Sequence, residues 1–231
     1  MKRRLFALLC LLLAAGFMAL GVWQLERRVW KLDLIARVES RIHAPPRPLT
    51  DLTVFSDADA YTRVRLTGTF QNDRETLVQA LTERGAGWWV VTPLRTPGGT
   101  VLVNRGFVPA QFRDPTTRPA PGRTVEVVGL LRASEPGGGF LRRNDPTSNR
   151  WYSRDVAAIA RARGLEQAAP FFVDAEAGSG YPIGGLTVVA FRNAHLAYAL
   201  TWFGLAALSL AGAAIVWRSG VGRRGEPARA V

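Results

Sequence analysis

Two long apolar segments without a charged residue lie near opposite ends of the chain, at Leu5–Trp23 and Leu196–Trp217. A helix rises about 1.5 Å per residue, and the apolar core of a bilayer is roughly 30 Å thick, so each segment is long enough to cross a membrane. The stretch between them is polar enough to be water-soluble. We therefore predict two transmembrane helices that flank one domain, with both ends of that domain on the same side of the membrane.

Basic residues flank both apolar segments on the side of the chain termini. These residues are Lys2, Arg3 and Arg4 before the first segment, and Arg218, Arg223, Arg224 and Arg229 after the second. Under the positive-inside rule the two tails are cytoplasmic and the main domain is extracytoplasmic. Arg27, Arg28 and Lys31, just beyond the first segment, are a countersignal.

We predict that the first segment is a retained membrane anchor and not a cleaved signal peptide. Bulky residues, Val22 to Leu25, stand where a small-residue cleavage site is expected. No amphipathic leader rich in Arg and Ser precedes the segment, so we predict a bacterial inner (plasma) membrane with the main domain in the periplasm. The predicted parts are a cytoplasmic tail at 1–4, transmembrane helix 1 at 5–23, a helical extension with a Pro-rich linker at 24–48, an extracytoplasmic β-rich domain at 49–191, transmembrane helix 2 at 192–217 and a cytoplasmic tail at 218–231.

The composition limits the chemistry of the outer domain. The formal net charge is +12, but about half of the excess lies in the tails, where anionic lipid explains it. An extracytoplasmic domain does not meet DNA, so we predict a membrane-lipid partner and no nucleic acid. Cys10 is the single cysteine and lies inside the first apolar segment, so no intramolecular disulfide forms.

The outer domain is predicted to be β-rich, because Thr62–Phe70 alternates apolar and polar side chains as a half-buried strand does. Further strands are predicted at 75–80, 87–95, 100–108, 124–133, 170–173 and 186–191, with a hairpin turn at Pro97–Gly99. One helix is predicted after Ser153 as its N-cap, ending at Gly164. The predicted fold class is membrane-anchored α+β, with two transmembrane helices flanking a mainly antiparallel barrel or sandwich that contains one helix.

Catalytic motifs are absent from the sequence. Two histidines and one cysteine in a membrane segment do not assemble a tetrahedral zinc site of nitrogen and sulfur ligands. Neither a Gly-x-Ser-x-Gly elbow nor a phosphate-binding or dinucleotide-binding glycine pattern occurs. We predict that the protein is not an enzyme.

Functional side chains concentrate where the two anchors meet the outer surface. On the second anchor they are Arg192, His195, Tyr198 and Trp202, spaced along one helix face, and on the first they are Trp23, Arg27 and Trp30. We expect these two faces to meet. One interpretation is an aromatic belt with arginines that reach to the interface. The other is a haem site, in which His195 ligates the metal and an arginine pairs with a propionate.

Four motifs in register resemble the Surf-one family (Surfeit locus protein 1, SURF1). They are Leu20–Lys31 at the first anchor, Asn104–Pro109 in mid-domain, Asn144–Pro146 followed by Trp151–Asp155, and Arg192–Phe203 at the second anchor. The order and spacing of the motifs, together with both anchors, are similar to the family across nearly the whole chain.

The resemblance implies an assembly factor for haem-copper, aa3-type cytochrome c oxidase, with the chaperone-like role of helping haem A reach the catalytic subunit. It implies that haem A is bound transiently, that His195 is the metal-linked residue, and that haem A synthase and the oxidase catalytic subunit are partners. A second hypothesis stays open, in which the protein is a scaffold that holds oxidase subunits or the synthase and binds no cofactor.

Overall fold

The computed structural model describes residues 2–50, 54–118, 122–139, 141–178, 180–187, 191 and 193–221. The chain forms two compact units, Met1–Ala36 with Ala190–Val231, and Arg37–Val189. The first unit contains α3 (His195–Val221) and most of α1 (Lys2–His43), and the second contains the strands and α2 (Val156–Ala162).

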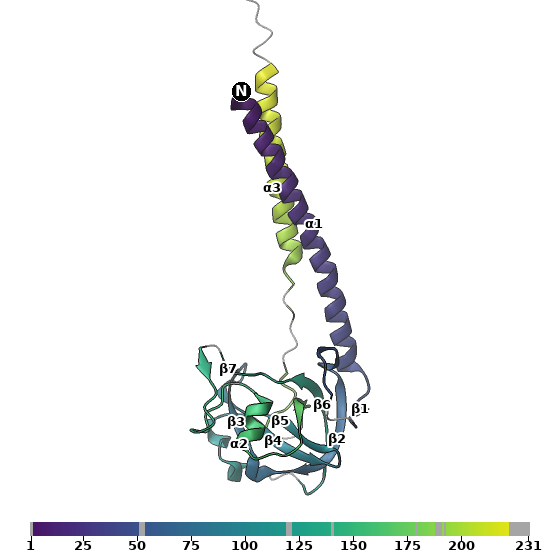
Figure 1. The fold of residues 1–231 in the computed structure, drawn as a ribbon, viewed down its shortest axis with the longest axis vertical. Helices are drawn as coiled ribbons and strands as arrows, with labels where there is room; N and C mark the ends of the chain where they lie inside the picture. The colour runs from purple at the N-terminus through teal and green to yellow at the C-terminus, as the bar shows by residue number, and fades with distance from the viewer. Residues whose placement is uncertain are drawn as a thin grey trace, which may run out of the picture. The chain divides into compact units, whose positions relative to one another are not determined.

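In the first unit, α1 and α3 pack as an antiparallel pair (Figure 1). Gln24 contacts His195 near the start of α3, and Phe17, earlier in α1, stacks on Trp202 with ring centroids 5.7 Å apart. Further along, Cys10 lies beside Gly212. As residue numbers increase along α3, the residues that it contacts on α1 have decreasing numbers, so the two helices are antiparallel.

Small residues form the buried seam of this helix pair. They are Ala7, Cys10, Ala14 and Gly21 on α1, and Ala199, Ala206 and Ala213 on α3. The alanines of α3 recur every seven residues, the repeat of two helices that stay in contact, and small side chains let the backbones approach closely. A Cβ atom at Gly21 would lie 2.4 Å from the ring of Phe203, so this approach requires glycine.

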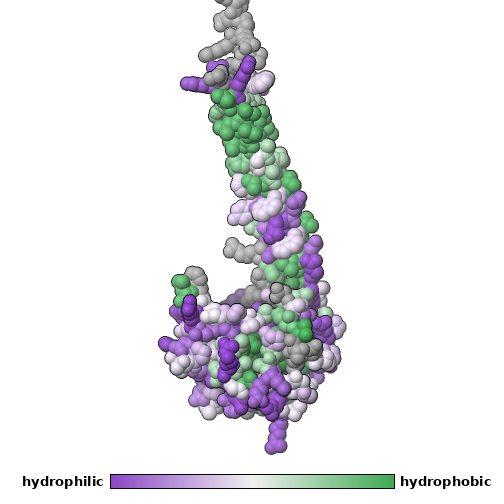
Figure 2. Space-filling model, viewed as in Figure 1, coloured by the Kyte–Doolittle hydropathy of each residue, from purple (hydrophilic) through white to green (hydrophobic). Residues whose placement is uncertain are grey.

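Large apolar side chains cover the outward faces of both helices, as the green surface along them in Figure 2 shows. Both helices are long and apolar enough to cross a membrane, and only 22% and 17% of their most apolar windows are buried. The prediction of two long apolar helices at the two ends of a β-rich domain is confirmed.

In the second unit, five strands close into a barrel. Their order is β2 (Arg63–Phe70), β6 (Val125–Ala133), β9 (Ala168–Ala175), β5 (Gly99–Val108) and β4 (Gly85–Thr96). β4 pairs back with β2, which closes the ring. Within the ring only β5 and β9 run parallel, so the prediction of a mainly antiparallel domain is confirmed. The sequence left barrel and sandwich open, and the observed domain is a barrel.

Shorter elements decorate the barrel. β3 (Thr76–Thr82) pairs with β4, and β1 (Arg47–Pro48) pairs in parallel with β2, while β7 (Gly138–Gly139) and β8 (Arg142–Arg143) form a separate hairpin. Four 3-10 turns lie at η1 (Asp57–Asp59), η2 (Asn72–Arg74), η3 (Ala110–Phe112) and η4 (Pro115–Thr117). Part of the predicted Pro-rich linker is thus strand β1.

Two apolar clusters lie on opposite faces of the strands. Every barrel strand contributes to the inner cluster, which includes Leu66, Leu94, Val103, Leu131 and Phe171. Residues of opposite parity, such as Leu102 and Phe172, point outward and form a second cluster with α2 and with Trp151, which is 1% exposed. The alternation predicted for the strands therefore buries both of their faces in this region.

The predicted strands match the observed ones except at the end of the domain. Within the predicted strand 186–191, the described residues Leu186, Thr187 and Phe191 are not in a strand, and residues 188–190 lie outside the described part. The predicted helix begins later than expected. Asp155 and not Ser153 is its N-cap, because the Asp155 carboxylate accepts from the backbone N–H of Ala158, whereas the Ser153 hydroxyl donates to the carbonyl of Glu135.

Gly106 holds β5 against the chain that leaves the barrel. Its φ of 130° is unfavourable for other residues, and a Cβ atom there would lie 2.3 Å from the backbone of Ile183. We expect Gly106→Ala to lower the free energy of unfolding by at least about 2 kcal/mol, measured by denaturant unfolding with near-ultraviolet circular dichroism. Gly178→Ala is the matched control, because no atom lies within 4 Å of a Cβ at that position. Equal losses in the two variants would contradict this account.

Candidate functional site

His195 and Gln24 form what we call the histidine site. His195 is the first residue of α3, and its Nδ1 lies 2.7 Å from Oε1 of Gln24 on α1. An amide oxygen only accepts, so Nδ1 is the protonated nitrogen in this pairing and Nε2 keeps its lone pair. Among the described residues nothing bonds to Nε2. The imidazole is therefore oriented by one nitrogen and open at the other, which is the arrangement of a ligating histidine.

Aromatic and cationic side chains surround the same end of the helix pair. The Arg27 guanidinium lies 4.3 Å from the ring centre of Trp30, and Lys31 Nζ lies 5.2 Å from that of Phe191. Such contacts keep each cation near an aromatic ring, where the charge is stabilised without a carboxylate.

The two predicted faces meet only in part. His195 and Trp202 do face α1, where they contact Gln24 and Phe17, and Gly21 lies against Phe203 of α3. The expected face of Trp23, Arg27 and Trp30 stays a prediction; its two tryptophans are about half exposed, and Tyr198 is 58% exposed. The packed side of α1 carries its buried small residues together with Phe17, which stacks on Trp202. Arg192 lies outside the described residues.

The histidine site suits only a metal that brings most of its own ligands. Within the described ranges, no three His, Cys, Asp or Glu side chains come together to hold a metal ion. An iron in a porphyrin already has four ring nitrogens and requires one or two axial ligands from protein. One oriented histidine meets that requirement.

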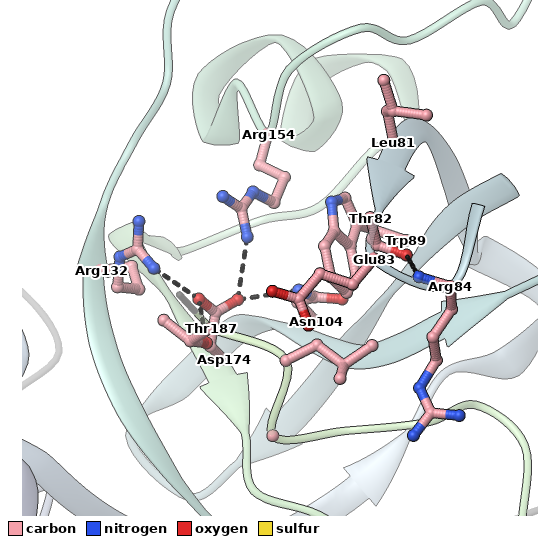
Figure 3. Close-up of a pocket in the computed structure, with 12 residues that line it drawn as sticks. Leu81, Thr82, Glu83, Arg84, Trp89, Asn104, Arg132, Arg154, Asp174 and Thr187 are labelled. Atoms are coloured by element: carbon pink, nitrogen blue, oxygen red, sulfur yellow. Dashed lines mark hydrogen bonds and ion pairs between the residues drawn. The ribbon is translucent and has the colours of Figure 1, made fainter. Parts of the chain in front are cut away.

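A second polar centre lies on the outer face of the barrel around Asp174, which is 3% exposed. Its carboxylate accepts four hydrogen bonds, from Asn104 Nδ2 at 2.8 Å, Arg154 Nη1 at 3.0 Å, Arg132 Nη1 at 2.8 Å and Thr187 Oγ1 at 2.9 Å. Figure 3 shows these side chains around Asp174. Four donors fill both carboxylate oxygens. Asp174 is thus an organising group that holds two arginines in place.

Arg154 is also paired with Glu135, and both charges are stabilised by the pairing. Burial by itself lowers the pKa of Arg154, but Asp174 and Glu135 outweigh it and the pKa is raised. Burial likewise raises the pKa of Glu135, but the hydrogen bonds and charge of Arg154 outweigh it and the pKa is lowered from 4.5. Both groups therefore stay ionised at neutral pH.

Beside this network is a cavity of about 410 Å³, which we call the Asp174 cavity. Arg132, Arg154 and Asp174 line one side, and the β3–β4 hairpin with Trp89 lines the other (Figure 3). The volume lies in the range of small-molecule sites.

The Asp174 network was not predicted from the sequence. Asp174 follows Phe171–Val173 inside a strand that is buried over most of its length. A lone carboxylate in such a strand must be paired, and this was the sequence signal for a buried charge network. Asn104 lies within β5, as predicted for the strand at 100–108, and its side chain also supports Asp174. Arg132 and Asn104 are 42 and 70 residues away from Asp174 in sequence, so spacing alone did not reveal these partners.

Comparison with known proteins gives consistent matches along the chain. Residues 11–207 match the model of the SURF1 family. Surfeit locus protein 1 of Xenopus tropicalis is 39% identical over 223 residues, which cover 86% of this chain and 71% of that protein, and the human protein is 39% identical with 85% and 72% covered. A SURF1-like protein of Monosiga brevicollis is 36% identical over 226 residues, with 89% and 85% covered.

Removal of the Asp174 charge tests the network. We expect Asp174→Asn to lower the free energy of unfolding by about 3–5 kcal/mol, because two mostly buried guanidinium groups lose a carboxylate that they share. Glu126→Gln is the matched control. Glu126 pairs with Arg65 at 4.0 Å on the exposed surface, and its loss should cost under about 1 kcal/mol. Denaturant unfolding of the two variants measures the difference, and equal small losses would contradict a role for the network in stability.

The lowered pKa of Glu135 predicts a dependence on acid. Its folded-state pKa lies below the unfolded value, so the stabilisation is complete above about pH 4.5 and is lost as the pH falls through the lowered pKa. We expect Glu135→Gln to flatten the acid side of a plot of unfolding midpoint against pH. A variant with the same acid slope as the wild type would show that Glu135 carries no such linkage.

Proposed function

Because this chain belongs to the SURF1 family, we propose that it is an assembly factor for a haem-copper, aa3-type cytochrome c oxidase. In this role it binds haem A at the histidine site and assists delivery to the oxidase catalytic subunit. Haem A synthase is the partner that supplies the haem. The single observation that carries the proposal is the oriented imidazole of His195 with its open Nε2.

The membrane placement follows from the two helices and the charges beside them. Both helices expose apolar side chains on their outward faces, which lipid would cover. The basic N-terminal residues and Arg218 support cytoplasmic tails, so the barrel domain lies on the outer side of a bacterial inner membrane. The histidine site then lies near the outer end of the membrane-spanning region.

Each residue of the histidine site has a distinct task. Gln24 accepts from Nδ1 and fixes the plane and tautomer of the imidazole, so that His195 Nε2 would be the atom that holds the haem iron. Arg27 and Lys31 provide positive charge nearby, which suits the propionates of a haem that faces water. The small-residue seam below holds the two helices in register.

The second candidate function is a scaffold without cofactor. Leu81 is 86% exposed at the tip of the β3–β4 hairpin, and Leu141 is 89% exposed between β7 and β8. Exposed apolar side chains at hairpin tips are suited to contact with another protein. This reading needs no ligand at His195.

Haem content of purified variants separates the two functions. We expect His195→Ala, made in cells that produce haem A, to lose most bound haem and to lower oxidase activity, because the axial ligand is gone. Gln24→Ala should keep part of the haem and bind it roughly tenfold more weakly, since an orienting partner and not a ligand is lost. The measurement is the haem-to-protein ratio from a pyridine haemochrome spectrum at matched expression.

His43→Ala is the matched control, because His43 is the other histidine of the chain and its side chain is exposed on α1. That variant should keep wild-type haem content. Wild-type haem content in His195→Ala would eliminate His195 as the ligand. A wild-type protein that is colourless at every expression level would favour the scaffold.

A further inference from the structure

A groove lies between α1 and α3 at the end of the helix pair where the chain begins, and we call it the terminal groove. Its volume is about 610 Å³, which lies in the range of small-molecule sites. Ala7 and Ala213, each 8% exposed, are its most buried lining residues, and the larger side chains of Leu11, Leu210 and Trp217 stand beside them. Small side chains between large ones thus leave a channel along the helix pair.

The terminal groove is apolar except at Arg4, the one charged residue among the described residues that line it. Residues 1–25 and 195–225 contain no Asp or Glu, so neither helix offers Arg4 a carboxylate. Lys2, Arg3 and Arg218 add positive charge at the same end. In Figure 2 this end of the helix pair is hydrophilic and adjoins the hydrophobic band. Arg4 therefore requires an anion from outside the helix pair.

The charged and apolar parts of the terminal groove lie at different depths. Cys10 lies beside Gly212 in the antiparallel pair, so Trp217, five residues after Gly212, is level with the start of α1 near Arg4. Leu210 lies seven residues before Trp217, which is roughly 10 Å deeper along the helix. Tryptophan is typical of the membrane interface. Arg4 then lies at the level of lipid head groups, and the apolar part of the groove lies among acyl chains.

We propose that the terminal groove binds one anionic phospholipid, with its phosphate on Arg4 and an acyl chain between Leu11 and Leu210. The site rests on the membrane placement in the proposed function and uses no residue of the histidine site. Guanidinium groups pair with phosphate through two parallel hydrogen bonds, and basic pockets between transmembrane helices on the cytoplasmic side suit anionic head groups. A zwitterionic lipid is less suited, because its own cation competes with Arg4 for the phosphate.

Dioleoyl phosphatidylglycerol and dioleoyl phosphatidylcholine are matched probes, because they have the same acyl chains and differ in net charge. Native mass spectrometry of the full chain from detergent should count one tightly bound phosphatidylglycerol, and phosphatidylcholine should bind about tenfold more weakly. Glycerol phosphate has the anion without the chains and should not compete at equal concentration.

The arginines at the start of α1 allow a matched test of the head-group contact. Arg4→Gln should weaken phosphatidylglycerol binding at least about tenfold, because the neutral amide forms no charge-assisted pair. Arg3→Gln removes the same charge from a residue that is exposed and does not line the groove, and it should bind nearly as wild type. Equal losses in the two variants would show general attraction to a basic tail and would overturn the site.

Two exposed alanines of α3 test the acyl-chain contact in the same way. Ala214 lines the terminal groove and Ala211 does not. Ala214→Trp should fill the groove and weaken phosphatidylglycerol binding about tenfold, whereas Ala211→Trp should bind as wild type. Both side chains face outward, so neither change should disturb the helix pair.

Failure of the lipid site is distinguishable from failure of the proposed function. Equal binding of the two phospholipids, competition by glycerol phosphate, or wild-type binding by Ala214→Trp would overturn the lipid site alone. Release of the protein from membranes by alkaline carbonate would overturn the membrane placement and the lipid site together. Arg4→Gln should keep the wild-type haem-to-protein ratio, because Arg4 lies at the opposite end of the helix pair from His195.

Discussion

Closure of the barrel depends on a very short contact between β2 and β4. Only Thr69–Arg95 and Phe70–Leu94 pair there, and a Cβ atom on the preceding Gly68 would lie 2.3 Å from the carbonyl oxygen of Arg95. The two strands approach because Gly68 has no side chain. Without this contact the sheet would be open, with β1 beside β2 at one edge and β3 beside β4 at the other, and the inner apolar cluster would lose its enclosure.

The same ring places the charges of the outer face. β9 lies between β6 and β5, and its register sets Asp174 opposite Leu130 on one neighbour and Asn104 on the other. Arg132, two residues beyond Leu130, and Asn104 therefore reach one carboxylate from opposite sides. The network is a consequence of strand order, since a β9 at a sheet edge would offer Asp174 to only one strand and to water.

Local patterns predicted the local elements well. Alternation in Thr62–Phe70 indicated β2, and the glycine turn at Pro97–Gly99 indicated the β4–β5 hairpin. The face of α1 was not predictable from apolar periodicity, because the segment is apolar on every side and only the spacing of Ala7, Ala14 and Gly21 marks the seam. The Asp174 network was missed for another reason, since strand order joins residues that are distant in sequence. Leu186 and Thr187 have strand-like composition, but they lie across the Asp174 cavity outside any strand.

The histidine site and the Asp174 network differ in how firmly their side chains are held. The Asp174 cavity has donors fixed by four hydrogen bonds to one carboxylate, whereas the histidine site offers one imidazole held by one hydrogen bond. A carrier must release its cargo to the next protein, and differences in affinity reside mainly in the dissociation rate. A site with two strong axial ligands from the same chain would hold haem firmly, as electron-transfer cytochromes do. Under the proposed function, one histidine held by one hydrogen bond is therefore better matched to transfer of haem than to its storage.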